Sequence, residues 1–405
     1  MVIRATTRVG KTRTLNVQPG ALTVAFDEQT VLAYDRAGRL WSAFLRGYTF
    51  RRGLDGGMLA KWTEHGQRER RQLWPSEASL IVWRCAELMS HLADEATFDV
   101  PPHVRQELDM LIGRAMRFTA QAAHTDAEHF LQVYKPIGIL PPDQYLALVL
   151  QLTEGCSFNT CTFCTFYRDR PFHIKSPAEF RQHIAAVRDY LSDSLLLRRG
   201  VFLADANALV VPQQQLVPLL TVLQEELKKL EDLKLLARVP LPLFAFLDAF
   251  SGRKKSAGDY AELSARGLQR VYVGLESGHD PLLAWLRKPG YSADTVETAR
   301  AIKAGGVSVC IIVLLGAGGE KFAERHVRDT IKVINAMELG TGDLVYFSGF
   351  VATPEQPYGR IAARDHIEPL SMEEMRAQRR EIEVGLRFPG PRPKLATYDI
   401  REFVY

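Results

Sequence analysis

The first 60 residues alternate apolar and polar positions in short runs that are separated by turn residues. Three of these runs have the period of two that is typical of half-buried strands: 23–26, 30–34 and 40–45. Residues 35–38, Asp-Arg-Ala-Gly, predict a turn between the second and third runs. The period then becomes helical over 76–95 and 102–123, and two prolines separate these segments. The pattern predicts a small antiparallel sheet followed by two helices.

From about residue 145 the pattern changes to an alternation of apolar strands and amphipathic helices. We expect strands at 146–152, 201–204, 233–239, 271–275, 307–315 and 344–347, the third of them with the weakest pattern. Helical patterns follow most of them, at 177–191, 213–229, 260–267, 293–304, 323–337 and 372–386. Repeated strand–helix units predict parallel strands with right-handed crossovers. The pattern alone leaves open a barrel, a partial barrel or an open doubly wound sheet.

Hydropathy and charge narrow the class of protein. No apolar run approaches about 18 residues, and the N-terminus lacks the apolar core of a signal peptide, so we expect a cytoplasmic protein without a membrane span. The formal net charge is only +4, but residues 1–75 hold 13 Lys/Arg against 6 Asp/Glu. A solvated basic face is the favoured explanation of this bias, and a surface that contacts nucleic acid is the alternative.

Three of the five cysteines, Cys156, Cys161 and Cys164, lie within nine residues. The odd number of cysteines in a cytosolic chain argues against a disulfide framework. The three follow the first strand of the strand–helix series, and parallel α/β folds place their chemistry at such strand ends. Zinc would require a fourth protein ligand, which is absent at metal-ligand spacing. Three thiolates suit a four-iron four-sulfur cluster with one open iron, and structural zinc stays the alternative.

Residues 155–164 read Gly-Cys-Ser-Phe-Asn-Thr-Cys-Thr-Phe-Cys, with the aromatic Phe163 directly before the last cysteine. This loop resembles that of the radical S-adenosylmethionine (SAM) superfamily. The commonest spacing there is C-x3-C-x2-C, whereas this chain has C-x4-C-x2-C and is similar to a subset with the longer first gap. The resemblance covers about residues 143–350. It implies an α/β fold, a partial (β/α)6 TIM-like barrel with an N-terminal α+β extension and a short C-terminal segment.

The resemblance also implies domain boundaries and metal ligands. We expect an extension of unknown role at 1–140, the radical SAM core at 141–365, and a C-terminal helix with an extended tail at 366–405. The three cysteines would ligate the 4Fe-4S cluster, and Phe163 would shield it and contact the cofactor. The N-terminal region is expected to cap the mouth of the barrel.

Further SAM contacts are implied at the ends of later strands. Asp205 and Asn207 follow the second strand, where the superfamily holds the SAM amino group, although Asn207 stands where the subset often has Asp. Glu276, followed by Ser277, is placed to accept hydrogen bonds from the ribose hydroxyls. Gly316 begins a turn at which the backbone approaches adenine. The alternatives are an Asx turn at Asp205 and a solvated charge at Glu276.

One sequence feature near these positions has a simpler interpretation. Residues 288–290, Lys-Pro-Gly, are interpreted as a plain helix stop, although relatives have a Lys-Gly helix break there.

The implied chemistry is reductive cleavage of SAM to a 5′-deoxyadenosyl radical, which abstracts hydrogen from a substrate. The expected partners are an unidentified small-molecule or peptide substrate and a reductase such as flavodoxin or ferredoxin. No residue is assigned a catalytic role. The alternative is an RNA- or tRNA-modifying enzyme of the same superfamily, in which Arg51 and Arg52 of the basic N-terminal region bind phosphates of the nucleic acid.

Overall fold

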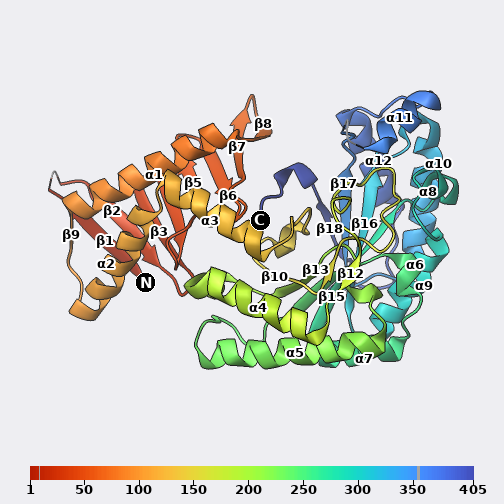
Figure 1. Cartoon of the computed structure of the whole chain (residues 1–405). Coiled ribbons are helices and arrows are strands. Elements are labelled where there is room, and N and C mark those ends of the chain that lie inside the picture. Colours follow the sequence, from red (N-terminus) through yellow and green to blue (C-terminus); the bar gives the residue numbers. More distant parts are fainter. Residues whose placement is uncertain (9, 354–355) are drawn as a thin grey trace.

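The chain folds around two sheets that have largely separate apolar cores. The computed structural model describes residues 1–8, 10–353 and 356–405. Figure 1 shows the antiparallel N-terminal sheet on one side and the parallel sheet with its surrounding helices on the other. The boundaries of the predicted domains stay predictions, but the change from an antiparallel to a parallel sheet falls between residues 98 and 148.

The N-terminal sheet is an antiparallel meander with the strand order β8-β7-β6-β5-β4-β3-β2-β1-β9. Its strands are β1 (Val2–Thr7), β2 (Thr12–Val17), β3 (Ala21–Asp27), β4 (Thr30–Asp35), β5 (Leu40–Leu45), β6 (Tyr48–Arg52), β7 (Met58–Glu64), β8 (Gln67–Gln72) and β9 (Ala96–Phe98). The predicted antiparallel sheet is confirmed and is larger than expected. One face is buried, as the strict alternation of exposed and buried positions in β1 shows.

Three helices accompany this sheet: α1 (Pro75–Glu95), α2 (Pro102–Arg117) and α3 (Ala120–Val133). Apolar side chains of α1 and α2 join the core of the sheet. The single helix expected at 102–123 is wrong in its extent, because the chain breaks at Phe118 and Thr119. The Thr119 hydroxyl accepts the Ala122 N–H at 3.3 Å and caps α3, which explains why a new helix begins there.

The second sheet is parallel throughout, with the order β10-β13-β14-β15-β16-β17-β18. Its strands are β10 (Leu148–Gln151), β13 (Val201–Ala204), β14 (Leu243–Leu247), β15 (Leu268–Glu276), β16 (Ser308–Leu315), β17 (Leu344–Gly349) and β18 (Lys394–Thr397). Because β10 and β18 remain at the two edges, the barrel is partial, and the predicted (β/α)6 architecture is confirmed with one added strand.

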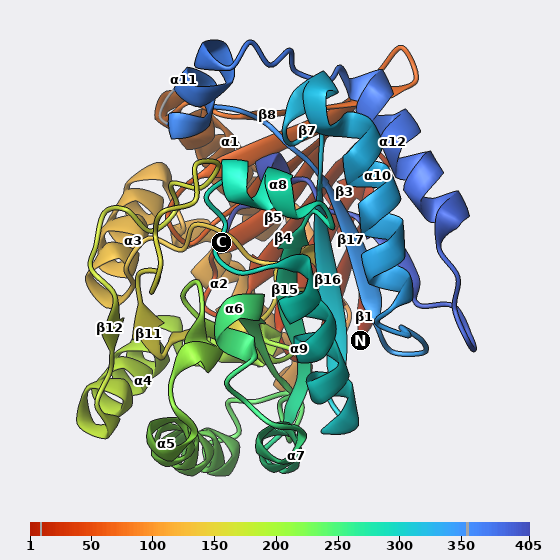
Figure 2. The same cartoon turned by 90° about the vertical axis from the view of Figure 1, so that its right-hand side faces the viewer.

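Helices connect successive strands of this sheet. The crossovers contain α4 (Pro177–Leu191), α5 (Gln213–Asp232), α6 (Ala249–Gly252), α7 (Ala257–Ala265), α8 (Asp280–Trp285), α9 (Ser292–Ala304), α10 (Gly319–Asn335), α11 (Pro357–Arg364) and α12 (Met372–Gly385). Short 3-10 turns are η1 (Pro142–Gln144), η2 (Ser192–Leu197), η3 (Ala208–Val210) and η4 (Ile400–Glu402). Figure 2 shows α9 packed along the outer face of β15 and β16.

The third expected strand, at 233–239, is wrong. The leucines that suggested it follow the end of α5, where Leu233 and Lys234 form a turn with Lys234 at positive φ. The strand β14 begins only after Pro240 and Pro242, which lack the N–H groups that a central strand must donate. Phe244 and Leu247 supply the buried side chains that the sheet requires at this place.

The C-terminal segment returns to the barrel and crosses its open side. After β18, the Tyr398 hydroxyl donates to the Leu140 carbonyl at 2.8 Å. The Tyr405 hydroxyl donates to the Ala147 carbonyl at 3.2 Å and accepts the Val149 N–H at 3.1 Å. The tail therefore satisfies backbone groups on the free edge of β10, which a closed barrel would pair with a strand. Among the described residues, no helix has the length and apolarity that crossing a membrane requires.

Tyr405→Phe tests this role of the tail. The variant leaves the buried Val149 N–H without its acceptor, so we expect the free energy of unfolding to fall by about 1–3 kcal/mol in urea. Tyr291→Phe, at a tyrosine that is 67% exposed, is the matched control and should change it little. Equal stability of the two variants would contradict the proposed edge contact.

Candidate functional site

A cavity lies where the strands of the parallel sheet end. It encloses about 1190 Å³, including open solvent at its mouth. Six of the predicted site residues line it: Cys156, Cys161, Phe163, Cys164, Asn207 and Glu276. Among the described residues, Ile139 is the only one of the expected extension 1–140 that lines it, and the N-terminal sheet, which was expected to cap the mouth, contributes nothing to the wall. Phe350, Gln356 and Ile400, from segments after β17 and β18, contribute to the wall instead.

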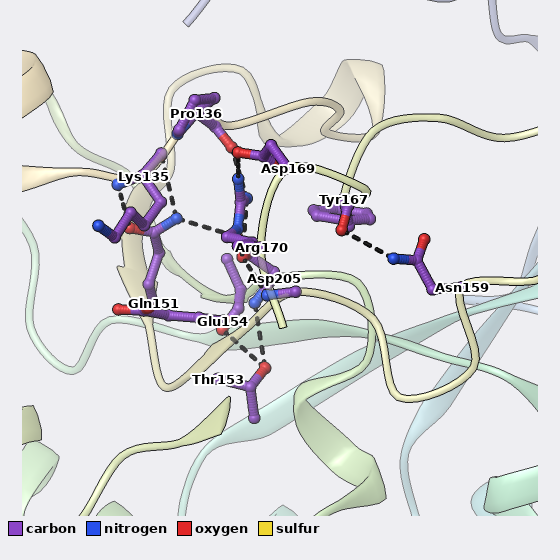
Figure 3. Close-up of polar contacts among 12 residues, drawn as sticks. Lys135, Pro136, Gln151, Thr153, Glu154, Asn159, Tyr167, Asp169, Arg170 and Asp205 are labelled. Atoms are coloured by element: carbon purple, nitrogen blue, oxygen red, sulfur yellow. Dashed lines mark hydrogen bonds and ion pairs between the residues drawn. The ribbon is translucent and has the colours of Figure 1, made fainter. Parts of the chain in front are cut away.

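The cysteine loop leaves the body of the protein through a narrow base. The short strands β11 (Thr153–Glu154) and β12 (His173–Ile174) pair antiparallel and bring its two ends together. Gly155 opens the loop at φ +74, and a Cβ there would lie 2.7 Å from the Pro171 carbonyl oxygen, so this position requires glycine. Within the loop, the Asn159 side chain donates to the Tyr167 carbonyl at 3.0 Å (Figure 3).

The carboxylate of Asp205 bonds to both ends of this loop, and its contacts with Arg170 and Gln151 are drawn in Figure 3. One oxygen accepts the Gly155 N–H at 2.9 Å and an Arg170 N–H at 2.9 Å, while the other accepts the Gln151 amide at 2.9 Å. The side chains of Asp205 and Arg170 are only 1% and 6% exposed. Burial raises the pKa of Asp205, and Arg170, Gln151 and the Gly155 N–H act against that shift. We call the contacts of Asp205 with Gly155, Gln151 and Arg170 the loop clasp.

The clasp also reaches the segment before the barrel. Arg170 donates to the Pro136 carbonyl at 2.7 Å, and the Gln151 side chain exchanges hydrogen bonds with both backbone groups of Lys135 (Figure 3). Through these bonds, one buried ion pair fixes the strand end, the linker and both ends of the cysteine loop.

Three of the predicted SAM contacts lie outside the lining of the cavity. Asp205 is occupied by the loop clasp. The Ser277 hydroxyl bonds to His326 Nδ1 at 2.7 Å and is fully buried. The Gly316 N–H donates to the Gln378 side chain at 2.8 Å. For Ser277 the reason is the strand pleat, since Tyr272, Gly274 and Glu276 face the cavity at a period of two and Ser277 falls on the opposite side.

Two polar pairs stand on the cavity wall. Lys288 Nζ lies 3.0 Å from Glu276 Oε1. A Cβ on Gly274 would lie 2.3 Å from the same oxygen, so the glycine makes room for this pair. Burial opposes protonation of Lys288, but the neighbouring acids outweigh it and raise its pKa. In the second pair, the Asn207 side chain donates to the Asp248 carboxylate and accepts the Asp248 N–H at 3.3 Å.

Sequence reasoning missed the partners of the predicted residues. Lys288 was assigned to a helix stop, yet it lines the cavity beside Glu276. Asp248 was not predicted as a site residue, because the strand that it follows, β14, was expected at 233–239 and not at Leu243–Leu247. Arg170 had no motif of its own, and the only signal was the Arg-Asp-Arg stretch at 168–170, at the far end of the cysteine loop.

The chemistry of the donors fits an iron–sulfur cluster. The three thiols line one cavity, and burial raises the pKa of Cys164 to about 11 and also raises that of Cys161. Among the described residues, no three His, Cys, Asp or Glu side chains converge to hold a single metal ion. Three thiols spread around a cavity suit a larger group such as a four-iron cluster, whose iron would stabilise the thiolates. Phe158, Phe163 and Phe166 provide an apolar surrounding.

Comparison with known proteins identifies the class. Residues 150–334 match the family model of the radical SAM superfamily, so this part of the chain is a radical SAM domain. The match confirms the predicted superfamily, together with the 4Fe-4S cluster and SAM as the cofactors that this superfamily uses. It includes the cysteine loop, the loop clasp and both polar pairs of the cavity.

Solved structures of radical SAM enzymes resemble parts of the chain. Cobalamin-dependent OxsB is 14% identical at a TM-score of 0.38, over 59% of this chain and 31% of its own. The methyltransferase TsrM from Kitasatospora setae is 18% identical at a TM-score of 0.38, and the match covers 54% of this chain and 39% of TsrM. Coproporphyrinogen III oxidase (HemN) from Escherichia coli is 14% identical at a TM-score of 0.37, and the match covers 64% of this chain and 54% of HemN. The chain thus spans about a third of OxsB and TsrM. No curated protein matches the chain by sequence.

Asp205→Asn tests the loop clasp. The substitution keeps the shape of the side chain but leaves the Arg170 guanidinium with only the exposed Asp169 carboxylate, 2.6 Å away, so we expect a loss of about 1–3 kcal/mol in the free energy of unfolding. Urea denaturation measures it. Asp189→Asn, at an exposed pair with Arg188, is the control and should cost less than about 1 kcal/mol. A clasp variant as stable as this control would show that the ion pair does not hold the loop.

A buried histidine next to the clasp predicts acid sensitivity. His183 Nε2 accepts the Gln151 N–H at 3.0 Å, and burial, helped by Lys175 and opposed by Glu154, lowers the pKa of His183 to about 4. An unfolded histidine titrates near 6.5, so the unfolded chain binds the proton first and stability falls as pH drops from about 6.5 towards 4.

For this histidine alone the loss approaches about 3 kcal/mol. We expect His183→Gln to flatten the slope of the unfolding free energy over this pH range, whereas the exposed His124→Gln leaves it unchanged. An unchanged slope in the His183 variant would refute the assignment.

Proposed function

We propose that the chain is a radical SAM enzyme in which Cys156, Cys161 and Cys164 hold the 4Fe-4S cluster and the adjoining cavity binds SAM. The observation that carries this proposal is that the three thiols and the Glu276–Lys288 pair line the same cavity within the matched domain. When bound, the cluster and SAM supply one-electron chemistry that generates a hydrogen-abstracting radical. The protein must position SAM and substrate and exclude water from them.

We assign the positioning of SAM to the polar pairs. Glu276 accepts hydrogen bonds from a ribose diol, and Lys288 orients its carboxylate through the ion pair at 3.0 Å. The Asp248 carboxylate and the Asn207 carbonyl oxygen are acceptors for the SAM amino group, near the cysteine loop, because Asn207 also contacts Ser157 at 3.4 Å. Ile312 and Leu314 form an apolar wall for adenine. The substrate, which is a small molecule or a peptide, would occupy the part of the cavity beside Ser348 and Tyr398.

The alternative of an RNA-modifying enzyme depended on Arg51 and Arg52 as exposed phosphate-binding residues, and the structure does not support that role. Arg52 is only 8% exposed and bonds to the Ala123 carbonyl at 2.8 Å and to Asp126, and Arg51 faces an internal cavity. Neither arginine forms part of an exposed phosphate-binding surface. The proposed electron donor is a small reductase of the flavodoxin or ferredoxin type.

Anaerobically reconstituted protein, reduced with dithionite and given SAM, tests the cysteine assignment. We expect slow formation of 5′-deoxyadenosine by the wild type and none by Cys164→Ala, because the variant lacks one of the three cluster thiolates. Cys85→Ala is the control, since Cys85 is buried in the N-terminal core, and it should retain both iron and product. A Cys164→Ala protein that keeps about four irons and forms product would overturn the assignment.

Glu276→Gln tests the SAM site separately. Loss of the charged acceptor should weaken SAM binding by about tenfold or more, which corresponds to one charge-assisted hydrogen bond. Equilibrium binding of SAM to the cluster-loaded protein measures this. The exposed Glu297→Gln serves as the matched control. If the two variants bind SAM equally well, Glu276 does not contact the ribose.

A further inference from the structure

A second cavity lies between the N-terminal sheet and the barrel, away from the candidate active site. Tyr145 and Arg198, which precede β10 and β13, line it from the barrel side. Trp41 and Arg51 line it from the N-terminal sheet. Because these barrel residues precede their strands, the cavity lies at the opposite end of the strands from the cysteine loop. We call it the arginine cavity.

Four guanidinium groups line the arginine cavity, against one carboxylate, Asp35: Arg39, Arg51, Arg52 and Arg198. Two of the four have acidic partners, since Asp126 lies 2.7 Å from Arg39 and 3.3 Å from Arg52. Across the described residues, no carboxylate lies within 4.0 Å of a nitrogen of Arg51 or Arg198. Two of the guanidinium groups that line the cavity therefore lack a direct ion-pair partner.

Hydrogen-bond donors in the cavity are unsatisfied as well. Arg198 Nε, Trp41 Nε1 and the Tyr145 hydroxyl are buried atoms that have no hydrogen-bond partner in the described structure. Arg198 is only 6% exposed. The Asp35 carboxylate does not bond to them and accepts instead from the Ser194 hydroxyl and the N–H groups of Ala37 and Arg39. Buried donors without acceptors are costly, so this arrangement favours an added acceptor.

We propose that the arginine cavity binds a small oxyanion of the phosphate type. The cavity encloses about 500 Å³, including open solvent. Two guanidinium forks, an indole N–H and a phenol O–H present more donors than a planar carboxylate accepts, and they suit a tetrahedral anion. The source is either free phosphate or the phosphate group of a small metabolite.

The bound anion would join the two halves of the molecule. Trp41 and Arg51 belong to the N-terminal sheet, whereas Tyr145 and Arg198 belong to the barrel. An acceptor shared by both sets stabilises the docked arrangement, so ligand binding should raise the unfolding temperature of the whole chain. The inference does not depend on radical chemistry, because none of these residues lines the cysteine cavity.

Thermal unfolding of the anaerobically prepared full chain tests this proposal, with inorganic phosphate as the probe and sodium chloride at equal ionic strength as the reference. We expect phosphate to raise the midpoint saturably by a few degrees in the wild type. Arg51→Gln and Arg198→Gln should lose this response. Arg46→Gln, at an exposed arginine of the same sheet, should keep it.

Trp41→Phe provides a second variant that keeps the packing but removes one donor, in case Arg198→Gln does not fold. Isothermal titration should then show phosphate binding weakened severalfold. Glycerol phosphate, run in parallel, distinguishes the sources, since tighter binding than inorganic phosphate indicates an organic phosphate and equal binding indicates the free anion. A wild-type protein that responds to phosphate no more than to chloride, or variants that respond as the wild type does, would overturn the proposal.

Discussion

The candidate active site depends on one buried ion pair. The Asp205 carboxylate accepts hydrogen bonds from Gly155 at the start of the cysteine loop and from Arg170 near its end. A buried carboxylate is tolerated only when its oxygens are satisfied, and here both oxygens are used. Separating the two ends of the loop would therefore leave charge unpaired in the interior. This cost fixes the base from which the three cysteines project.

The pleat of the parallel strands determines the rest of the cavity. In β15, Tyr272, Gly274 and Glu276 face the interior, and the missing side chain of Gly274 leaves space for Glu276 to meet Lys288. Apolar side chains of β16 form the opposing wall. Polar groups thus stand at a few defined points in an otherwise apolar cavity, as is usual where a protein must orient a cofactor and exclude water.

The basic character of the N-terminal region is used largely within the molecule. Arg39 bonds to the Tyr190 carbonyl at 2.7 Å and to the Ser194 hydroxyl at 2.9 Å, both in the barrel. Lys61 and Arg70 form ion pairs with Glu402 and Asp399 of the C-terminal tail. The charge bias of residues 1–75 therefore reflects in part how the sheet docks on the barrel and its tail. Arg51, which has no ion-pair partner among the described residues, lines the arginine cavity.

The sequence by itself determined the elements whose signals are local. The helix at Pro177–Leu191 and the strand at Val201–Ala204 have the predicted bounds, because apolar period and capping residues act over a few neighbours. The strand expected at 233–239 failed because a leucine-rich stretch after a helix has the same composition as a buried strand. The spacing of the three cysteines likewise identified the superfamily from a single loop.

Only the tertiary structure decided which side chains meet. Asp205 and Ser277 stand beside predicted cavity residues in the sequence, yet each lies outside the cavity lining. The partners that matter most come from other elements of the chain, 35 residues apart for Arg170 and Asp205 and 12 residues apart for Lys288 and Glu276. Such pairings depend on the order of strands and on strand register. These are set by the packing of the whole sheet, and no local pattern of residues encodes them.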